Sequence, residues 1–202
     1  MKASAPAGRT CAGVAVERLR YAAVRLIALP LRIAFERVTL AAASWHTAAG
    51  CRVGVIRSSD AEAVSARIEA ALELIAQLDP RRIAWLRSAG VRIVGGHVRQ
   101  PRYWYMTDTI VLDLGFALMA SDAYLALAIV HEATHARMAR AGIWPWPDVV
   151  PRLEVRCHRE EIAFADRLPR DVYPSTDAAI AQYEERIRIY CSRTLNFRER
   201  AA

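Results

Sequence analysis

The chain has 202 residues, of which 54% are hydrophobic and 24% charged, so it can bury one substantial core and lacks the composition of a disordered segment. A formal net charge of +7 would ordinarily favour nucleic acid or an anionic membrane as a partner. However, Lys2 is the only lysine, and the arginines are scattered over every segment without a recognised nucleic-acid motif. Nucleic-acid binding is therefore not expected.

The first part of the chain is predicted to be an N-terminal helical extension at residues 1–50, ahead of a main domain at 51–202. From Val14 to Trp45 the sequence favours helix and is apolar, but charged residues interrupt it before it reaches the roughly 18 to 20 apolar residues of a membrane span. Pro30 should bend or split this helix. Because arginines lie opposite an apolar face, residues 14–45 are a candidate for contact with a membrane surface, although we favour packing on the domain.

The following segments predict an α+β domain. Cys51–Ile56 is expected to be a strand, and Ser59 stands three residues before Glu62, the spacing of a capping box at the start of a long amphipathic helix. That helix should reach Asp79 and continue briefly around Trp85. Short strands are expected in three β-branched or aromatic runs: Val91–Val94, Tyr103–Tyr105 and Thr109–Asp113.

The most informative stretch is residues 131–135, which read His-Glu-Ala-Thr-His, the HExxH pattern. Ser121 or Asp122 can cap a helix that contains it, and Gly142 is a natural stop. In a helix, positions i and i+4 lie on one face about 5 to 6 Å apart, so the two imidazoles can reach one metal ion. Glu132 would then lie beside the ion, where it can take a proton from a water molecule that the ion activates.

A second helix is expected after a proline-rich linker, with Asp148 as its cap and Pro151 in its first turn, and it should end near Leu168. Glu154 and Glu161 both fall on or beside its apolar stripe. A carboxylate in that position requires a partner, and a zinc ion is one such partner.

The position of each glutamate along the helix axis favours Glu154 as the third ligand. The first helix continues roughly 9 Å beyond His135, so an antiparallel helix that rises about 1.5 Å per residue brings Glu154 level with the histidines. Glu161 remains the alternative third ligand, with a supporting or substrate-facing role if Glu154 binds the metal. Glu160 points elsewhere.

These residues resemble the gluzincin group of zinc metallopeptidases, in which HExxH is followed at a variable spacing by a glutamate on a second helix. The eighteen residues between His135 and Glu154 are similar to the spacing in thermolysin-like and aminopeptidase-like members. Those families tend to carry a small residue three positions after the glutamate, where this chain has Cys157. The resemblance implies Zn²⁺ held by His131, His135 and Glu154, and a zincin-like fold whose sheet lies against the HExxH helix.

The chain also departs from that pattern. Thermolysin-like enzymes place an aspartate four residues after the ligand glutamate, where it orients one histidine, but here the position is His158. Between Arg156 and Arg159 it is most simply a solvated side chain, with transition-state donor or unusual ligand as alternatives. In zincin-like folds an edge strand pairs with the substrate, so Tyr103 and Tyr105 are candidates for substrate or transition-state contacts, although core packing is the simpler interpretation.

The end of the chain and its cysteines add two expectations. A last helix should open after Pro174 with an apolar stripe at helical spacing, formed by Ile180, Tyr183, Ile187 and Tyr190. The four cysteines form no paired motif and no secretory signal is recognised, which favours a cytoplasmic location, with membrane association through the N-terminal residues as a variant.

Together, the sequence predicts an α+β fold that is mainly helical, with a small sheet against the HExxH helix. The resemblance implies a zinc-dependent hydrolase, most simply a metallopeptidase that cleaves a peptide or protein substrate with Glu132 as general base. Two alternatives remain: an inactive zincin-like protein that binds a partner, and a peripheral membrane protein that uses its basic N-terminal helices.

Overall fold

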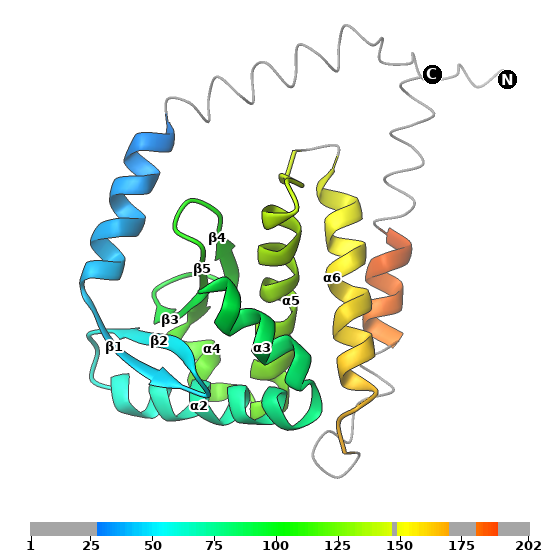
Figure 1. Ribbon diagram of the computed structural model, residues 1–202, viewed down its shortest axis with the longest axis horizontal. Helices are drawn as coiled ribbons and strands as arrows, with labels where there is room; N and C mark the ends of the chain where they lie inside the picture. The colour runs from blue at the N-terminus through cyan, green and yellow to red at the C-terminus, as the bar shows by residue number, and fades with distance from the viewer. Residues whose placement is uncertain (1–27, 147–148, 170–180, 190–202) are drawn as a thin grey trace, which may run out of the picture.

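The computed structural model describes residues 28–146, 149–169 and 181–189. A five-stranded mixed sheet with the order β1-β2-β3-β5-β4 lies at its centre. The strands are β1 (Ala43–Ala48), β2 (Cys51–Ile56), β3 (Arg92–Gly96), β4 (Arg102–Trp104) and β5 (Thr109–Asp113). Strands β2, β3 and β5 are parallel, whereas β1 and β4 pair antiparallel at the two edges (Figure 1).

Helices make up most of the described structure, as expected for a mainly helical α+β fold. They are α2 (Ala61–Leu78), α3 (Pro80–Ala89), α4 (Leu114–Met119), α5 (Asp122–Arg140) and α6 (Val150–Ala165), together with helices at 28–41 and 181–189. α5 packs against β4 and β5 and lies antiparallel beside α6 (Figure 1). None of the described helices is both long and apolar enough to cross a bilayer.

The sheet separates two apolar clusters, because successive residues of a strand face opposite sides. On one side, Ile93 and its neighbours join the large core formed with α2, α4 and α5. On the other side, Val94 and Val111 pack with Leu40 of the helix at 28–41. The sheet therefore fixes α5, and the HExxH residues on it, on the face opposite the first described helix.

The predicted N-terminal helix extends too far, because Ala43–Trp45 belong to β1. This strand turns into β2 at Ala49 and Gly50, whose φ angles are 47° and 74°, and the Trp45 indole N–H donates to the Leu40 carbonyl at 3.0 Å. The alanine-rich sequence favours helix locally, but pairing with the buried strand β2 overrides that preference. The sheet thus begins within the segment expected to be a helical extension.

Two shorter features also differ from expectation. The predicted capping box is wrong: Asp60 is the N-cap of α2 and makes no side-chain capping bond, while the Ser59 hydroxyl donates to the Asp60 carboxylate at 3.2 Å. The six-residue helix α4 is not expected from the sequence. It is capped by Asp113, whose carboxylate accepts the Phe116 N–H at 2.9 Å.

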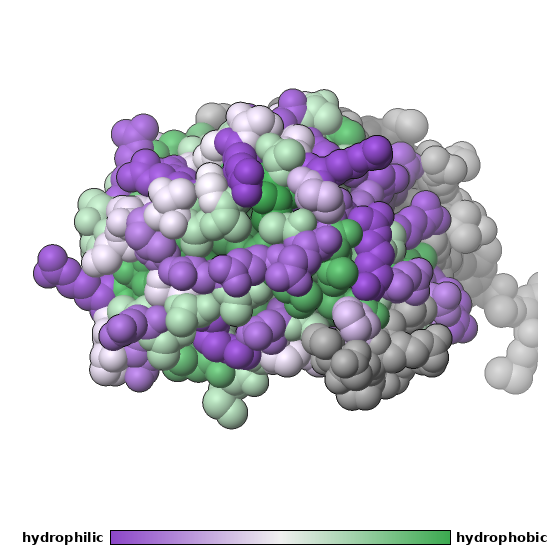
Figure 2. Space-filling view, turned by 60° about the horizontal axis from the view of Figure 1, so that its bottom comes forward, coloured by the Kyte–Doolittle hydropathy of each residue, from purple (hydrophilic) through white to green (hydrophobic). Residues whose placement is uncertain are grey.

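α2 is an amphipathic helix with one buried face. It buries Val64, Ile68, Leu72 and Ile75 in the core. The side of the molecule that lies at the bottom of Figure 1, along α2, mixes hydrophilic and hydrophobic residues without a continuous green area (Figure 2). This surface is typical of an ordinary solvent-facing helix.

Gly95 of β3 sets how closely α2 approaches the sheet. A Cβ atom at this position would lie 2.7 Å from Val64 Cγ1 and 3.3 Å from Leu114 Cδ2, and Val64 is fully buried. We expect Gly95→Ala to lower the free energy of unfolding by about 1 to 3 kcal/mol, because a packed core does not accommodate an extra methyl group. Equilibrium unfolding in urea measures the change, and an unaltered midpoint would show that α2 can shift.

Candidate metal centre

α5 holds the HExxH residues within the limits that the sequence predicts. The Ser121 hydroxyl caps the helix by accepting the Tyr124 N–H at 3.3 Å, and Gly142 follows its end with φ at 80°. One helical turn separates His131 from His135, and their Nε2 atoms lie 3.2 Å apart. Two imidazole nitrogens therefore face a common point between α5 and α6.

α6 begins at a different cap from the predicted one, because its N-cap is Val149, which makes no side-chain capping bond, and the predicted cap Asp148 is outside the described residues. Pro151 lies in its first turn as predicted, and the helix ends at Ala165, shortly before Leu168. Glu160 faces away from the histidines, as expected, and pairs with Arg82 at 2.8 Å. The face of α6 opposite Glu160 carries the polar residues that lie near the histidines, Glu154 and Glu161.

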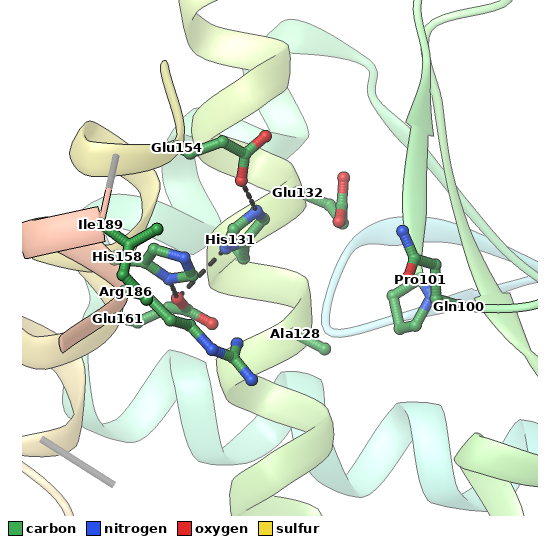
Figure 3. Close-up of a pocket in the computed structure, with 10 residues that line it drawn as sticks. All are labelled: Gln100, Pro101, Ala128, His131, Glu132, Glu154, His158, Glu161, Arg186 and Ile189. Atoms are coloured by element: carbon green, nitrogen blue, oxygen red, sulfur yellow. Dashed lines mark hydrogen bonds and ion pairs between the residues drawn. The ribbon is translucent and has the colours of Figure 1, made fainter. Parts of the chain in front are cut away.

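Glu154 completes a triangle of donor atoms with the two histidines. One carboxylate oxygen lies 3.4 Å from His131 Nε2, and the other lies 3.5 Å from His135 Nε2 (Figure 3 shows the first pair). Three ligands of a tetrahedral ion, each about 2.1 Å from the metal, are about 3.4 Å from one another. The two Nε2 atoms are 3.2 Å apart, and each lies 3.4 or 3.5 Å from a different oxygen of Glu154, so the three residues lie about as close together as the ligands of one zinc ion.

Glu161 contacts His131 on the Nδ1 side of the imidazole, away from Glu154. Its Oε2 lies 3.1 Å from His131 Nδ1 and also contacts His158 Nδ1, and the residue is only 5% exposed (Figure 3). When His131 Nδ1–H donates to this carboxylate, Nε2 keeps its lone pair for a metal ion. Glu161 thus lies where it can orient His131, which is the supporting role predicted for it if Glu154 binds the metal.

Tyr105 supports His135 in the same manner. Its hydroxyl oxygen lies 3.3 Å from His135 Nδ1, while Nε2 of that imidazole points to His131 and Glu154. An Nδ1–H bond to the hydroxyl again selects the tautomer whose Nε2 is a ligand atom. In both histidines, Nε2 is therefore the ring nitrogen that is oriented for metal coordination.

Glu132 lies beside the donor triangle and is 6% exposed. The main-chain N–H of Tyr103 faces this carboxylate and favours its charged form. Burial raises the pKa of Glu132, while the charges of His131 and His135 act in the opposite direction. A carboxylate whose pKa is raised toward neutrality is well suited to accept and return a proton.

The other predicted tyrosine contributes to the site through its main chain. The Tyr103 hydroxyl donates to Asp108, and its ring is 5% exposed within the large core. Burial, followed by the neighbouring Asp108, raises the pKa of this phenol. Its main-chain N–H faces Glu132, and the residue lines the smaller cavity together with Tyr105.

Two cavities of about 500 and 310 Å³ open onto these groups. Both are lined by His131, Glu132 and Glu154, and by Gln100 and Pro101 at the start of β4. The larger one is drawn in Figure 3, where Glu132 extends toward Gln100 and Pro101. The donor triangle is therefore accessible to a small molecule or a chain segment.

His158 is buried, which contradicts the expectation of a solvated side chain. It is 4% exposed, its ring stacks on Tyr183 with centroids 5.5 Å apart, and its centroid lies 5.2 Å from that of His131. Glu154, His158 and Glu161 are spaced i, i+4 and i+7, which places them on one face of α6. This periodicity was the sequence signal that the neighbouring arginines obscured.

The last predicted helix is described only at residues 181–189. Tyr183 is 6% exposed and packs on α6 through His158, as expected for the apolar stripe. The expected start after Pro174, and the stripe residues Ile180 and Tyr190, lie outside the described residues.

Two groups of possible metal ligands have donor atoms within 4.8 Å of one another in the described chain, and neither includes Glu154: His131 and His135 with Cys157, and His131 with His158 and Glu161. Burial raises the pKa of the Cys157 thiol, and the residue is fully buried. It therefore packs as a small protonated residue. His131, His135 and Glu154 line the smaller cavity together, whereas Cys157, His158 and Glu161 do not line it.

A comparison of this chain with protein-family models, curated proteins and solved structures found no match. The function therefore has to be inferred from the arrangement of these residues.

His131 carries a proton that a metal ion has to displace. Burial alone would lower its pKa, but hydrogen bonds to Glu154 and Glu161 outweigh burial and raise the pKa to about 10. Because a metal ion binds only neutral imidazole, we expect binding at pH 7 to release about one proton, and the affinity to rise about tenfold per pH unit below pH 10. Calorimetric titration with zinc in two buffers of different ionisation enthalpy measures the number of protons released. Equal heats of binding in the two buffers would contradict the expectation.

Proposed function

We propose that this protein is a zinc-dependent hydrolase, specifically a metallopeptidase with a gluzincin-like ligand set and a zincin-like arrangement of sheet and helix. The observation that carries the proposal is the triangle formed by His131 Nε2, His135 Nε2 and the Glu154 carboxylate. Two imidazoles and one carboxylate are a donor set of catalytic zinc sites, in which the fourth position is left for water or substrate.

The surroundings of the triangle also favour a metal over a simple ion-pair cluster. Glu161 and Tyr105 each hold the Nδ1 side of one histidine, which directs both Nε2 lone pairs to the same point. A bound zinc ion would polarise the scissile carbonyl and make a water molecule more acidic. Hydrogen-bonded support of ligand histidines of this kind typically increases metal affinity about 10- to 100-fold.

Glu132 is the residue that would move protons. It would accept a proton from the attacking water and return it to the amide nitrogen as the C–N bond breaks, so that the products are a carboxylic acid and an amine. Its carboxylate lies at the wall of both cavities, together with His131 and Glu154. Glu132 can therefore reach both the attacking and the leaving group.

The proposed substrate is a peptide in extended conformation. β4 is an edge strand of the sheet and contacts α5, and Gln100 and Pro101 at its start line both cavities. An extended peptide could add to this edge through main-chain hydrogen bonds and present one amide bond to the site.

Peptide cleavage by the zinc-loaded protein tests the proposal. We expect a mixture of unstructured peptides to be cut, cleavage to stop when a chelator removes the metal, and zinc to restore it, because the proposed mechanism requires the ion. Mass spectrometry of the products gives the cleaved bonds. Intact peptides in the presence of bound zinc would instead favour the inactive, partner-binding alternative.

A further inference from the structure

The helix at residues 28–41 presents an apolar stripe on its outer side. Glu36 and Leu40 are 1% and 6% exposed, whereas Leu31, Phe35 and Val38 are 75%, 62% and 71% exposed. The three exposed positions are spaced i, i+4 and i+7, so they form one line along the helix. Large apolar side chains exposed in a continuous line mark a surface that contacts another apolar body.

Arginines border this apolar stripe on both sides. At about 100° per residue, Arg32 lies on one side of the line through Leu31 and Val38, and Arg37 lies on the other. The guanidinium of Arg32 is held by Glu36 at 2.8 Å. Arginine side chains beside an apolar stripe can reach lipid phosphates while the stripe enters the acyl region.

A basic cavity of about 640 Å³ adjoins the same helix. Arg37 contributes to its lining from the helix, and Arg52 and Arg92 contribute from β2 and β3. The Arg52 guanidinium lies 4.8 Å from the centre of the Trp45 ring, and that of Arg92 donates to the Thr107 carbonyl. Three guanidinium groups around one cavity fit an anionic group such as a phosphate.

The carboxylate that lines this cavity is already neutralised. Asp108 forms an ion pair with Arg140 and accepts the Tyr103 hydroxyl. Burial, followed by the charge of Arg52, lowers the pKa of Arg92, while the charge of Asp108 acts in the opposite direction. The cavity therefore has an excess of positive charge.

We propose that this face docks on a membrane that contains anionic lipids. Leu31, Phe35 and Val38 enter the interface, and a lipid phosphate occupies the cavity of Arg37, Arg52 and Arg92. Charge favours this occupant over a second copy of the chain, because a symmetric dimer would bring the same basic groups together. The proposal is independent of the metal centre.

Sedimentation of the full chain with lipid vesicles tests this proposal. We expect the protein to bind vesicles of phosphatidylcholine and phosphatidylglycerol, and to bind vesicles of phosphatidylcholine alone only weakly. Binding should decrease as the salt concentration rises. Replacement of Leu31, Phe35 and Val38 by serine, or Arg37→Gln with Arg52→Gln, should each lower the partition coefficient about tenfold or more. All of the exchanged side chains are exposed, and circular dichroism checks that the variants fold.

Met119→Ser and Arg81→Gln are matched controls on other surfaces, with Met119 88% exposed on α4, and should bind as the parent does. Unchanged binding of the stripe or arginine variants would overturn the proposal, as would binding that is independent of phosphatidylglycerol. The parent protein could instead self-associate and not bind vesicles, and the serine variant could be a monomer. That result would identify a second copy of the chain as the occupant.

Discussion

Glu132→Gln is expected to lower the rate of peptide cleavage by about 10²- to 10⁴-fold while the zinc content stays unchanged. Glutamine has nearly the shape of glutamate, but its amide does not accept a proton at neutral pH. Glu132 lines the cavity beside the three proposed ligands without being one of them, so the exchange should leave the ligand atoms in place. Turnover of a fluorogenic peptide and elemental analysis of the same sample measure the two quantities.

Glu73→Gln is a suitable control for this variant. Glu73 is an exposed residue of α2 and lines neither of the two cavities at the metal centre. We expect parent levels of both activity and zinc for it. If Glu132→Gln retained the parent turnover, another group would have to move the proton and the assignment of the general base would be wrong.

The second large effect concerns the third ligand. Glu154→Gln should lose stoichiometric zinc, because an amide is a much poorer ligand than the carboxylate that now faces both Nε2 atoms. Glu161→Gln should retain the ion with an affinity about 10- to 100-fold lower, since it weakens only the support of His131. Competition with a chromophoric chelator measures both affinities.

These two variants control for each other, since both exchange a carboxylate for an amide on the same helix. Equal zinc retention would contradict the assignment of Glu154. Loss of zinc in Glu161→Gln alone would move the site to the group of His131, His158 and Glu161.

The fold could be predicted from the sequence where one physical signal dominated. Period-two or helical patterning identified β2, β3, β5, α2 and α5 because each buries a regular face. β1 was missed because Ala43–Ala48 is alanine-rich and becomes a strand only through its pairing with β2. α4 was missed because six residues contain too little periodicity, and it depends on the Asp113 cap.

The candidate site divides in a similar way. The convergence of His131, His135 and Glu154 follows from one helical turn and from an antiparallel return at a known rise, so it was accessible to reasoning from the sequence. The contact of Tyr105 with His135 could not be predicted, because thirty positions separate the two residues and only the tertiary structure brings them together.

The most direct measurement is the location of zinc by anomalous diffraction at its absorption edge, in crystals of the zinc-loaded protein. The result expected is a single strong peak about 2.1 Å from His131 Nε2, His135 Nε2 and an oxygen of Glu154. A peak on His158 and Glu161, a peak at Cys157, or no peak at the donor triangle would contradict the proposed metal centre and the hydrolytic function with it.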